Sequence, residues 1–248
     1  MNEIPIVQSK LFSNYKRLKF GISTRVGGVS PEPFGLNLSF NVGDDRVRVN
    51  ENRRRFFSAL AIPLEQLAIP DQVHSANVCL VSKPGAYESC DSLITITSEI
   101  FLVVTVADCL PIFLFDPTTK SIGVVHVGWR GSKLRILENT IKAMETEFGT
   151  KRKNIMATIG PSARTCCYEV GKDVANEFNE KFLRRSENKK YYLDLILFNR
   201  DILIDSGIYE NHIEILQDCT ICNRSLFHSY RRDGKAFGRM MGVIGISI

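Results

Sequence analysis

The sequence predicts an α/β protein, either α+β or a layered α/β/α arrangement, organised as a single domain over residues 1–248 with a mixed sheet. Short runs of β-branched and aromatic residues recur along the chain. Several of them precede the first long central helix, which excludes a regular βαβ alternation. A chain of 248 residues, 44% of them hydrophobic, is long enough to bury a core. No repeat or flexible linker divides it.

The expected strands and helices follow from the periodicity of apolar side chains. Strands are expected at residues 20–25, 78–81, 92–96, 101–106, 111–115, 122–127, 155–159, 213–216 and 240–246. Helices are expected at residues 47–61, 132–148, 172–183 and 194–206. Ser132 is expected to cap the second helix, whose apolar stripe comprises Leu134, Leu137, Ile141 and Met144.

Composition and charge exclude several classes of protein. The longest nearly apolar run, residues 100–107, is far shorter than the roughly 20 residues of a membrane helix. The N-terminus shows no secretory signal, and seven cysteines are typical of reduced thiols in a chain of this length. We therefore expect a cytoplasmic protein without membrane contact. The net charge of +5 is compatible with an anionic substrate but too small to predict nucleic-acid binding.

Three residues are candidate metal ligands. Cys109 and His126 stand at the ends of two apolar runs that the turn DPTTK joins, and His74 lies upstream in QVHS. One thiolate and two imidazoles form a tetrahedral zinc site with an open fourth position, which is the arrangement of catalytic zinc. The alternative is a buried cysteine and two core histidines, because free cysteines are commonly buried without a function.

The predicted pairing of the two strands does not decide whether the side chains of Cys109 and His126 lie on the same face. If Asp116 pairs with Lys120, Cys109 pairs with Val127, and strict alternation places His126 on the opposite face of the sheet. A bulge, or a break at Pro111, would bring the side chains together. If the metal site exists, we therefore expect a local irregularity in the hairpin near Pro111.

Arginines in glycine-rich segments are candidates for an anion site. Arg130 lies in HVGWRG, just ahead of a helix whose N-terminus would favour phosphate or carboxylate. Further candidates in polar or basic turns are Arg25, Asn41, Arg231, Arg232 and Arg239. The alternatives are arginines paired with structural carboxylates, a basic surface loop, and an asparagine that forms a turn.

A competing metal site uses other cysteines. Cys219 and Cys222 form a C-x2-C pair, and Cys166 with Cys167 could complete a structural zinc site of four thiolates. Because adjacent cysteines rarely chelate one ion well and no second C-x2-C pair exists, the sequence favours the site at Cys109.

Short motifs occur in one order along residues 21–246: STRVGGVS, LNLSFNVGDD, QVHS, TVADCLP, HVGWRG, IGPS, YEVG, DCT and SYRRDG. In this order they resemble the YfiH-type family, the laccase-domain or polyphenol oxidase proteins now regarded as purine nucleoside phosphorylases. The pair TVADCLP and HVGWRG is highly specific. The resemblance implies a single layered α/β domain related to cysteine-dependent toxin deamidases.

The resemblance also implies a function and its residues. The family's zinc ligands match His74, Cys109 and His126. The implied activities are phosphorolysis of adenosine, inosine, guanosine and methylthioadenosine, with adenosine deamination in addition. Purine nucleosides and phosphate are then the partners, with no obligatory protein partner. Asp108, beside the Cys109 ligand, is a candidate proton shuttle or an orienter of the ligands.

The phosphate would be held by some of the available polar groups, namely Arg25, Asn41, Arg130, Arg232 and Arg239. Two positions depart from the family's pattern. Phe237 replaces a threonine and is expected to alter a contact near the anion site, while CDS at residues 90–92 replaces ADA or ADG. We expect neither departure to touch a metal ligand.

Other functions are compared on the same residues. A true laccase needs paired H-x-H motifs, and four histidines without such a pair exclude it, although loosely bound copper that oxidises phenols in vitro is compatible. A cysteine hydrolase would use Cys109 as the nucleophile and His126 as the base. A third possibility is a nucleotide-binding protein without catalytic activity.

Overall fold

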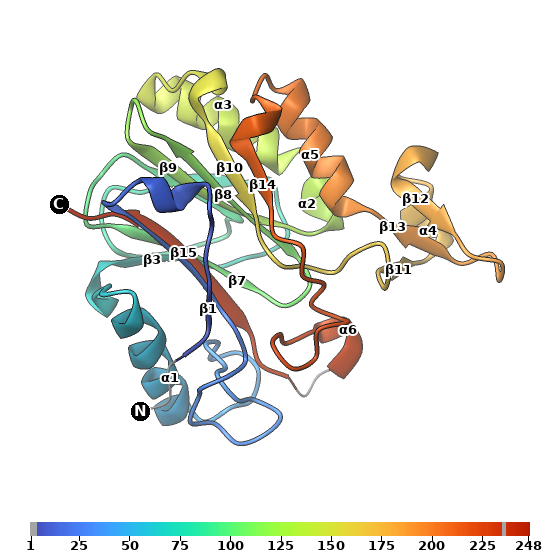
Figure 1. Cartoon of the computed structure of the whole chain (residues 1–248), viewed down its shortest axis with the longest axis horizontal. Helices are drawn as coiled ribbons and strands as arrows, with labels where there is room; N and C mark the ends of the chain where they lie inside the picture. Colours follow the sequence, from blue (N-terminus) through green and yellow to red (C-terminus); the bar gives the residue numbers. More distant parts are fainter. Residues whose placement is uncertain (1–3, 235–236) are drawn as a thin grey trace.

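A computed structural model describes residues 4–234 and 237–248 and contains two six-stranded mixed sheets with helices outside them (Figure 1). The first sheet has the order β1 (Ile6–Val7), β2 (Leu18–Ser23), β15 (Met240–Ile246), β7 (Phe101–Val106), β3 (Leu67–Pro70), β5 (Gly85–Tyr87). The second has the order β14 (Ile213–Ile215), β10 (Met156–Ile159), β8 (Leu110–Asp116), β9 (Ser121–Val127), β6 (Ser92–Thr95), β4 (Val78–Leu80).

The other elements lie around these sheets. A small third sheet contains β11 (Glu169–Val170), β13 (Tyr191–Leu193) and β12 (Leu183–Arg185). The α-helices are α1 (Arg46–Ala59), α2 (Trp129–Lys133), α3 (Ile136–Phe148), α4 (Lys172–Ala175), α5 (Leu195–Asp205) and α6 (Tyr230–Asp233). Short 3-10 helices occupy Phe12–Asn14, Leu64–Gln66, Arg152–Asn154, Glu180–Phe182 and Glu210–His212.

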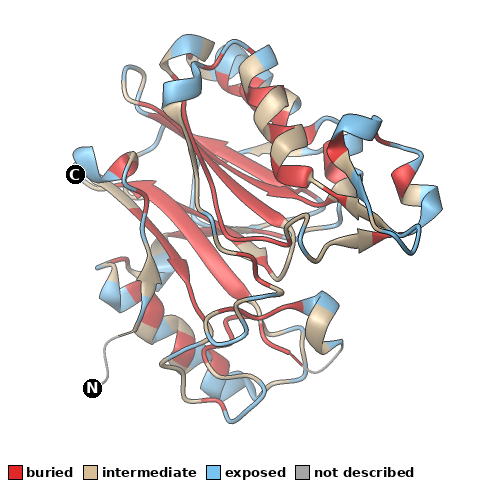
Figure 2. Cartoon of the chain, turned by 45° about the vertical axis from the view of Figure 1, so that its right-hand side comes forward, coloured by how far each residue is buried: buried red, intermediate tan, exposed pale blue. Residues whose placement is uncertain are grey.

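The two large sheets pack face to face, and helices cover their outer faces (Figure 2). Strand β8 shows the layering, because its side chains alternate between two cores. Ile112 and Leu114 pack with α3 and α5, whereas Phe113 packs against the first sheet, its ring centroid 4.9 Å from that of Phe20. On the far side, Phe56 of α1 packs on the first sheet. The predicted layered α/β class is confirmed, with the strands divided between two sheets.

Most of the predicted elements are present, but two predicted helices differ from the structure. The helix predicted at residues 132–148 is divided into α2 and α3, because Arg135 adopts a left-handed backbone with φ 62°. Ser132 lies inside α2 and caps nothing there, and Leu134 is 53% exposed. The helix predicted at residues 172–183 ends at Ala175. Among the described residues, no helix is both long and apolar enough to cross a membrane.

Candidate active site

The site lies where the chain crosses from the first sheet to the second. Strand β7 belongs to the first sheet and β8 to the second, and Cys109 stands directly before β8. His126 comes from the adjacent strand β9, and His74 from the loop after β3. The ligand atoms of these three side chains all lie within 4.8 Å of one another, with Cys109 Sγ 4.0 Å from His74 Nε2. The structure therefore brings the three predicted ligands together.

The register of the β8–β9 hairpin explains this convergence. Leu110 pairs with Val127 and Pro111 with His126, one residue away from the pairing that the sequence predicted. In this register Cys109, two residues before Pro111, falls on the same face as His126. The expected break at Pro111 is wrong, because the pairing is continuous from Leu110 to Asp116. The irregular residue is Asp108, whose φ of 90° turns the chain between the sheets.

Asp91 organises the ligands. Its buried carboxylate lies 2.7 Å from His126 Nδ1, which leaves Nε2 of that ring for a metal. The same carboxylate accepts hydrogen bonds from the backbone N–H groups of His74 and Ser75, at 3.0 and 2.6 Å. Asp91 is common to CDS and to the family's ADA or ADG, and the departures are its neighbours: Cys90 Sγ contacts the Tyr87 carbonyl, and Ser92 Oγ accepts a hydrogen bond from Thr140.

The local electrostatics favour a charged pair of ligands in the metal-free protein. Burial raises the pKa of the Cys109 thiol, but the neighbouring His126 and His74 outweigh this and lower it to about 6. Burial lowers the pKa of His126, but Cys109 and Asp91 outweigh this and raise it to about 9. A thiolate is the form of cysteine that binds metals or attacks carbon.

Two backbone features allow the close approach of the ligands. His74 adopts a left-handed backbone with φ 61°, which is unusual for a residue other than glycine. Gly128 follows β9, and a Cβ atom at this position would lie 3.2 Å from both Cys109 Sγ and His74 Cδ2. The glycine of the HVGWRG motif therefore leaves room for two of the ligands.

The three ligands open into a cavity of about 570 Å³. It is lined from the first sheet by Pro70, Thr105 and Met241, from loops by residues that include Asn41 and Gln72, and from α6 by Tyr230. Two arginines, Arg53 and Arg239, also line it. The fourth coordination position of a metal at the cluster would face this cavity.

Arg239 is the strongest candidate for binding an anion in this cavity. Its Nη1 atom is buried and has no hydrogen-bond partner among the described residues. The guanidinium lies over the Phe237 ring, 4.2 Å from the centroid, which fixes its plane. A buried donor without a partner is costly, which indicates that the described residues do not fully satisfy this guanidinium. Arg53, which no sequence motif indicated, stacks on Phe40 at 4.2 Å beside the same cavity.

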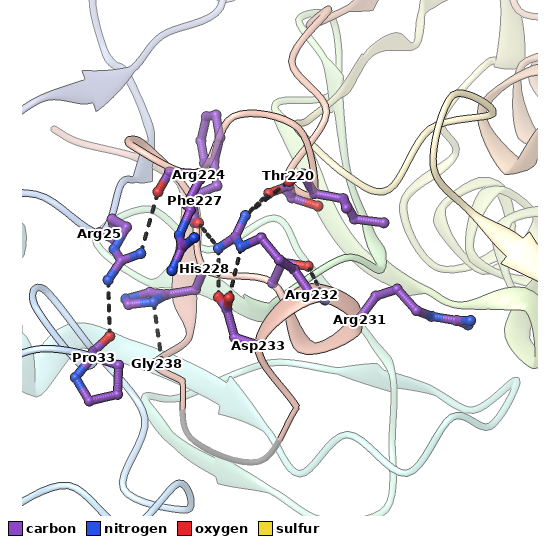
Figure 3. Close-up of polar contacts among 12 residues, drawn as sticks. Arg25, Pro33, Thr220, Arg224, Phe227, His228, Arg231, Arg232, Asp233 and Gly238 are labelled. Atoms are coloured by element: carbon purple, nitrogen blue, oxygen red, sulfur yellow. Dashed lines mark hydrogen bonds and ion pairs between the residues drawn. The ribbon is translucent and has the colours of Figure 1, made fainter.

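Arg25 and Arg232 do not line this cavity. Their side chains make polar contacts elsewhere, which Figure 3 draws. Arg25 pairs with Glu32, bonds the Pro33 carbonyl at 3.2 Å, and lines a separate cavity of about 660 Å³. Arg232 donates to Asp233 and to the carbonyls of residues 220, 221 and 227. Arg130 is exposed and stacks on Trp129 at 4.4 Å. Lys235 and Ala236, in the same basic run as Arg232, lie outside the described residues.

Both carboxylate oxygens of Asp108 accept hydrogen bonds from the protein. Oδ1 accepts from the Thr220 hydroxyl at 2.6 Å, and Oδ2 accepts from the Ser229 hydroxyl at 3.0 Å and the Arg231 backbone N–H at 2.7 Å. Its carbonyl accepts from Ala163 N–H at 2.9 Å. These contacts hold three loops around the Cys109 turn, which favours a positioning role over a proton shuttle.

The fold and the site together define a layered α/β protein with an open His–Cys–His cluster in a cavity lined by arginines. The chain belongs to the family described as multi-copper polyphenol oxidoreductase laccase, which matches residues 19–247.

Relatives and solved structures of similar length agree with this assignment. The chain is 34% identical to the purine nucleoside phosphorylase YlmD of Geobacillus stearothermophilus, over 91% of this chain and 89% of the relative. It is 33% identical to the adenosine deaminase RL5 from an unknown prokaryotic organism, over 83% and 84%. The crystal structure of the hypothetical protein YfiH from Bacillus licheniformis superposes with a TM-score of 0.93 at 30% identity, covering 99% of this chain and 98% of that one. The relation to toxin deamidases stays a prediction.

Proposed function

We propose that this chain, as one catalytic domain, is a zinc-dependent purine nucleoside phosphorylase that also deaminates adenosine. One observation carries the proposal: an open cluster of three potential metal ligands lies in the same cavity as Arg53 and Arg239. The names of relatives such as YlmD and RL5 support the two reactions. All seven cysteines are free, which supports the reducing environment of the cytoplasm.

The donor set fits zinc. His74, Cys109 and His126 supply two imidazoles and one thiolate at converging positions, and Asp91 orients His126 through Nδ1. When bound there, zinc supplies Lewis-acid chemistry, by polarising a substrate atom or by making water more acidic. Copper accepts the same three donors, so copper bound in vitro is compatible with the site.

In phosphorolysis, a phosphate oxygen attacks C1′ of the ribose, the bond from C1′ to the purine breaks, and the purine departs with the bonding electrons. In this proposal Arg239 holds the phosphate, while Arg53 adds positive charge and Asn41 a polar side chain to the lining of the same cavity. A guanidinium binds two phosphate oxygens in parallel, which fixes the direction of attack. Arg130 remains a secondary candidate because its side chain is exposed.

In deamination, water replaces the amino group at C6 of adenosine, and ammonia leaves. The chain's own contribution is the ordering of the site. Asp108 holds the loops on either side of Cys109, and Asp91 fixes the His126 ring. We propose one pocket for both reactions, because the three potential ligands and the arginines line the same cavity.

A laccase reaction is not supported. A multicopper oxidase needs a second cluster built from many imidazoles. Of the four histidines in the sequence, only His74 and His126 belong to a cluster of potential ligands among the described residues. The described residues therefore do not supply the copper ligands that the oxidase chemistry in the family's description would require.

A second function is favoured by one specific observation. Cys109, His126 and Asp91 form a chain of nucleophile, base and orienting carboxylate, which is the geometry of a cysteine hydrolase. Alkylation of the Cys109 thiol distinguishes the cysteine hydrolase from the metal-dependent enzyme. Loss of activity with the full metal content retained would favour the hydrolase, and loss of both together favours the metal site.

The test is incubation of metal-replete protein with inosine, with and without phosphate. We expect hypoxanthine and ribose 1-phosphate in equal amounts, only when phosphate is present, and inosine plus ammonia from adenosine. Hypoxanthine release that does not depend on phosphate would contradict phosphorolysis. Binding of inosine without any product would support the non-catalytic alternative instead.

A further inference from the structure

A second group of potential metal ligands lies outside the proposed active site. It combines two segments that are far apart in the sequence, one with adjacent cysteines and one with the C-x2-C pair. The four sulfur atoms all lie within 4.8 Å of one another, and they belong to Cys166, Cys167, Cys219 and Cys222. Cys222 Sγ is 3.4 Å from Cys166 Sγ and 3.1 Å from Cys167 Sγ.

We propose that a second zinc ion is bound by these four thiolates: Cys166, Cys167, Cys219 and Cys222. A tetrahedron with metal–sulfur bonds of about 2.3 Å has edges of about 3.8 Å. Two separations, 3.4 and 3.1 Å, are somewhat shorter than this, and all of them lie within 4.8 Å. Four protein ligands leave no open position, so this zinc is structural. Binding releases the remaining thiol protons to water and requires no oxidant.

The turns around the cysteines explain how adjacent residues can both serve as ligands. Backbone N–H groups of Cys167 and Tyr168 both donate to the Arg164 carbonyl, at 2.9 and 2.8 Å, so the chain coils tightly at this point. Cys166 and Cys167 then lie on the same side of the turn, toward Cys222. This answers the sequence-based objection that neighbouring cysteines rarely chelate one ion.

The C-x2-C turn is held by its own backbone. Asn223 N–H donates to the Cys219 carbonyl at 2.9 Å, and Arg224 N–H donates to the Cys222 carbonyl at 3.0 Å. Cys219 is buried, whereas Cys222 is exposed. The turn is also held in place from outside, because Arg232 Nη1 donates to the carbonyls of Thr220 and Ile221, at 2.8 and 3.1 Å.

The proposed ion would join the segments that support the active-site turn. A parallel bridge pairs Ser162 with Cys219, and Thr220 N–H donates to the Ser162 carbonyl at 3.0 Å. Thr220 also bonds Asp108, the residue before Cys109. A closed metal site at this position stabilises both loops without contacting the substrate cavity.

Zinc analysis of the full chain, purified under reducing conditions without chelators, tests the proposal. We expect two zinc ions per chain by native mass spectrometry in the wild type. Cys222→Ser and Cys109→Ala should each retain one, and the matched control Cys79→Ser, at a cysteine outside both clusters, should retain two. X-ray absorption of Cys109→Ala should show a shell of sulfur alone at about 2.3 Å.

An anomalous map of wild-type crystals above the zinc edge avoids any dependence on the folding of variants. A peak among the four sulfurs supports the proposal. No peak there, with a peak at His74 and Cys109, would overturn it and leave the proposed active-site zinc intact. A disulfide between Cys167 and Cys222 in protein purified under reducing conditions would also overturn the proposal. A single peak among the four sulfurs would instead contradict the active-site zinc.

Discussion

The two cysteine-containing clusters differ in construction and in what they leave open. The cluster of His74, Cys109 and His126 offers three donors and opens into a cavity, whereas the four-cysteine cluster offers four donors at the edge of the fold. An open position is what a catalytic metal needs, and a full set of protein ligands is typical of a structural one. The number and surroundings of the donors, rather than the presence of cysteine, separate the two proposed roles.

The contacts that hold the side chains in position also differ between the two clusters. The open cluster depends on a buried carboxylate, Asp91, which contacts His126 and the loop carrying His74. The four-cysteine cluster depends on two tight turns that bond their own backbone. A substitution in one cluster should therefore leave the metal of the other in place, and the following predictions test this separation.

The largest effect is expected from Cys109→Ala. Removing the thiolate should abolish metal binding at the open cluster and lower phosphorolysis by roughly 10³-fold or more, since a Lewis acid supplies several kcal/mol of stabilisation. Cys79→Ser is the control, because Cys79 lies outside both clusters. Phosphorolysis at the wild-type rate in Cys109→Ala, with no metal at its open cluster, would contradict the assignment of that cluster to catalysis.

Arg239→Met tests the anion site of the open cavity. Loss of this guanidinium from the cavity wall should raise the KM for phosphate and lower kcat/KM by roughly 10- to 100-fold, the usual contribution of hydrogen bonds to a charged group. Metal content at both clusters should not change. Arg25→Met, in the separate cavity, should leave the KM for phosphate unaltered. If Arg25→Met raised the KM for phosphate and Arg239→Met did not, the phosphate site would have to be assigned to Arg25 instead.

The sequence allowed the prediction of the fold class, most elements and the three residues that form the open cluster, because apolar periodicity and ordered motifs are local signals. It did not allow the prediction of how they meet. The β8–β9 register depended on a turn one residue longer than assumed, and this alone reversed the expected facing of Cys109 and His126. Asp91 and Arg53 were missed because their roles arise from contacts across the fold. A buried carboxylate between strand-like residues was the one signal that pointed to Asp91.

Asp91→Asn should weaken the open cluster without emptying the closed one. An amide can still contact His126 Nδ1 but does not carry the charge that orients and polarises the ring, so zinc affinity should fall roughly 10- to 100-fold. Competition with a chelator measures this. An equal loss of zinc from the four-cysteine cluster would show that the two sites are coupled rather than separate.

The same residue predicts a pH dependence of stability in the chelator-treated protein. Burial raises the pKa of Asp91, but hydrogen bonds from His126 and Ser75 outweigh this and lower it from 3.8 to about 2. A carboxyl with a lower pKa in the folded state stabilises that state above its unfolded pKa, and this contribution disappears as the pH falls toward 2. The unfolding free energies of wild type and Asp91→Asn should converge by on the order of 2 kcal/mol across this range. A difference that stays constant with pH would contradict the assigned role.

Gly128→Ala should have the smallest effect, and it separates crowding of the ligands from general strain. The added Cβ lies 3.2 Å from Cys109 Sγ and His74 Cδ2, so the ligands must move by a few tenths of an ångström. We expect a few-fold loss of zinc affinity at the open cluster, since small displacements of catalytic groups have graded costs. In the matched variant Gly131→Ala, the Cβ meets Ile136 Cγ2 at 3.3 Å instead, which should lower stability without altering zinc affinity. If both variants lose zinc equally, the turn as a whole, rather than the space beside the sulfur, determines the geometry of the open cluster.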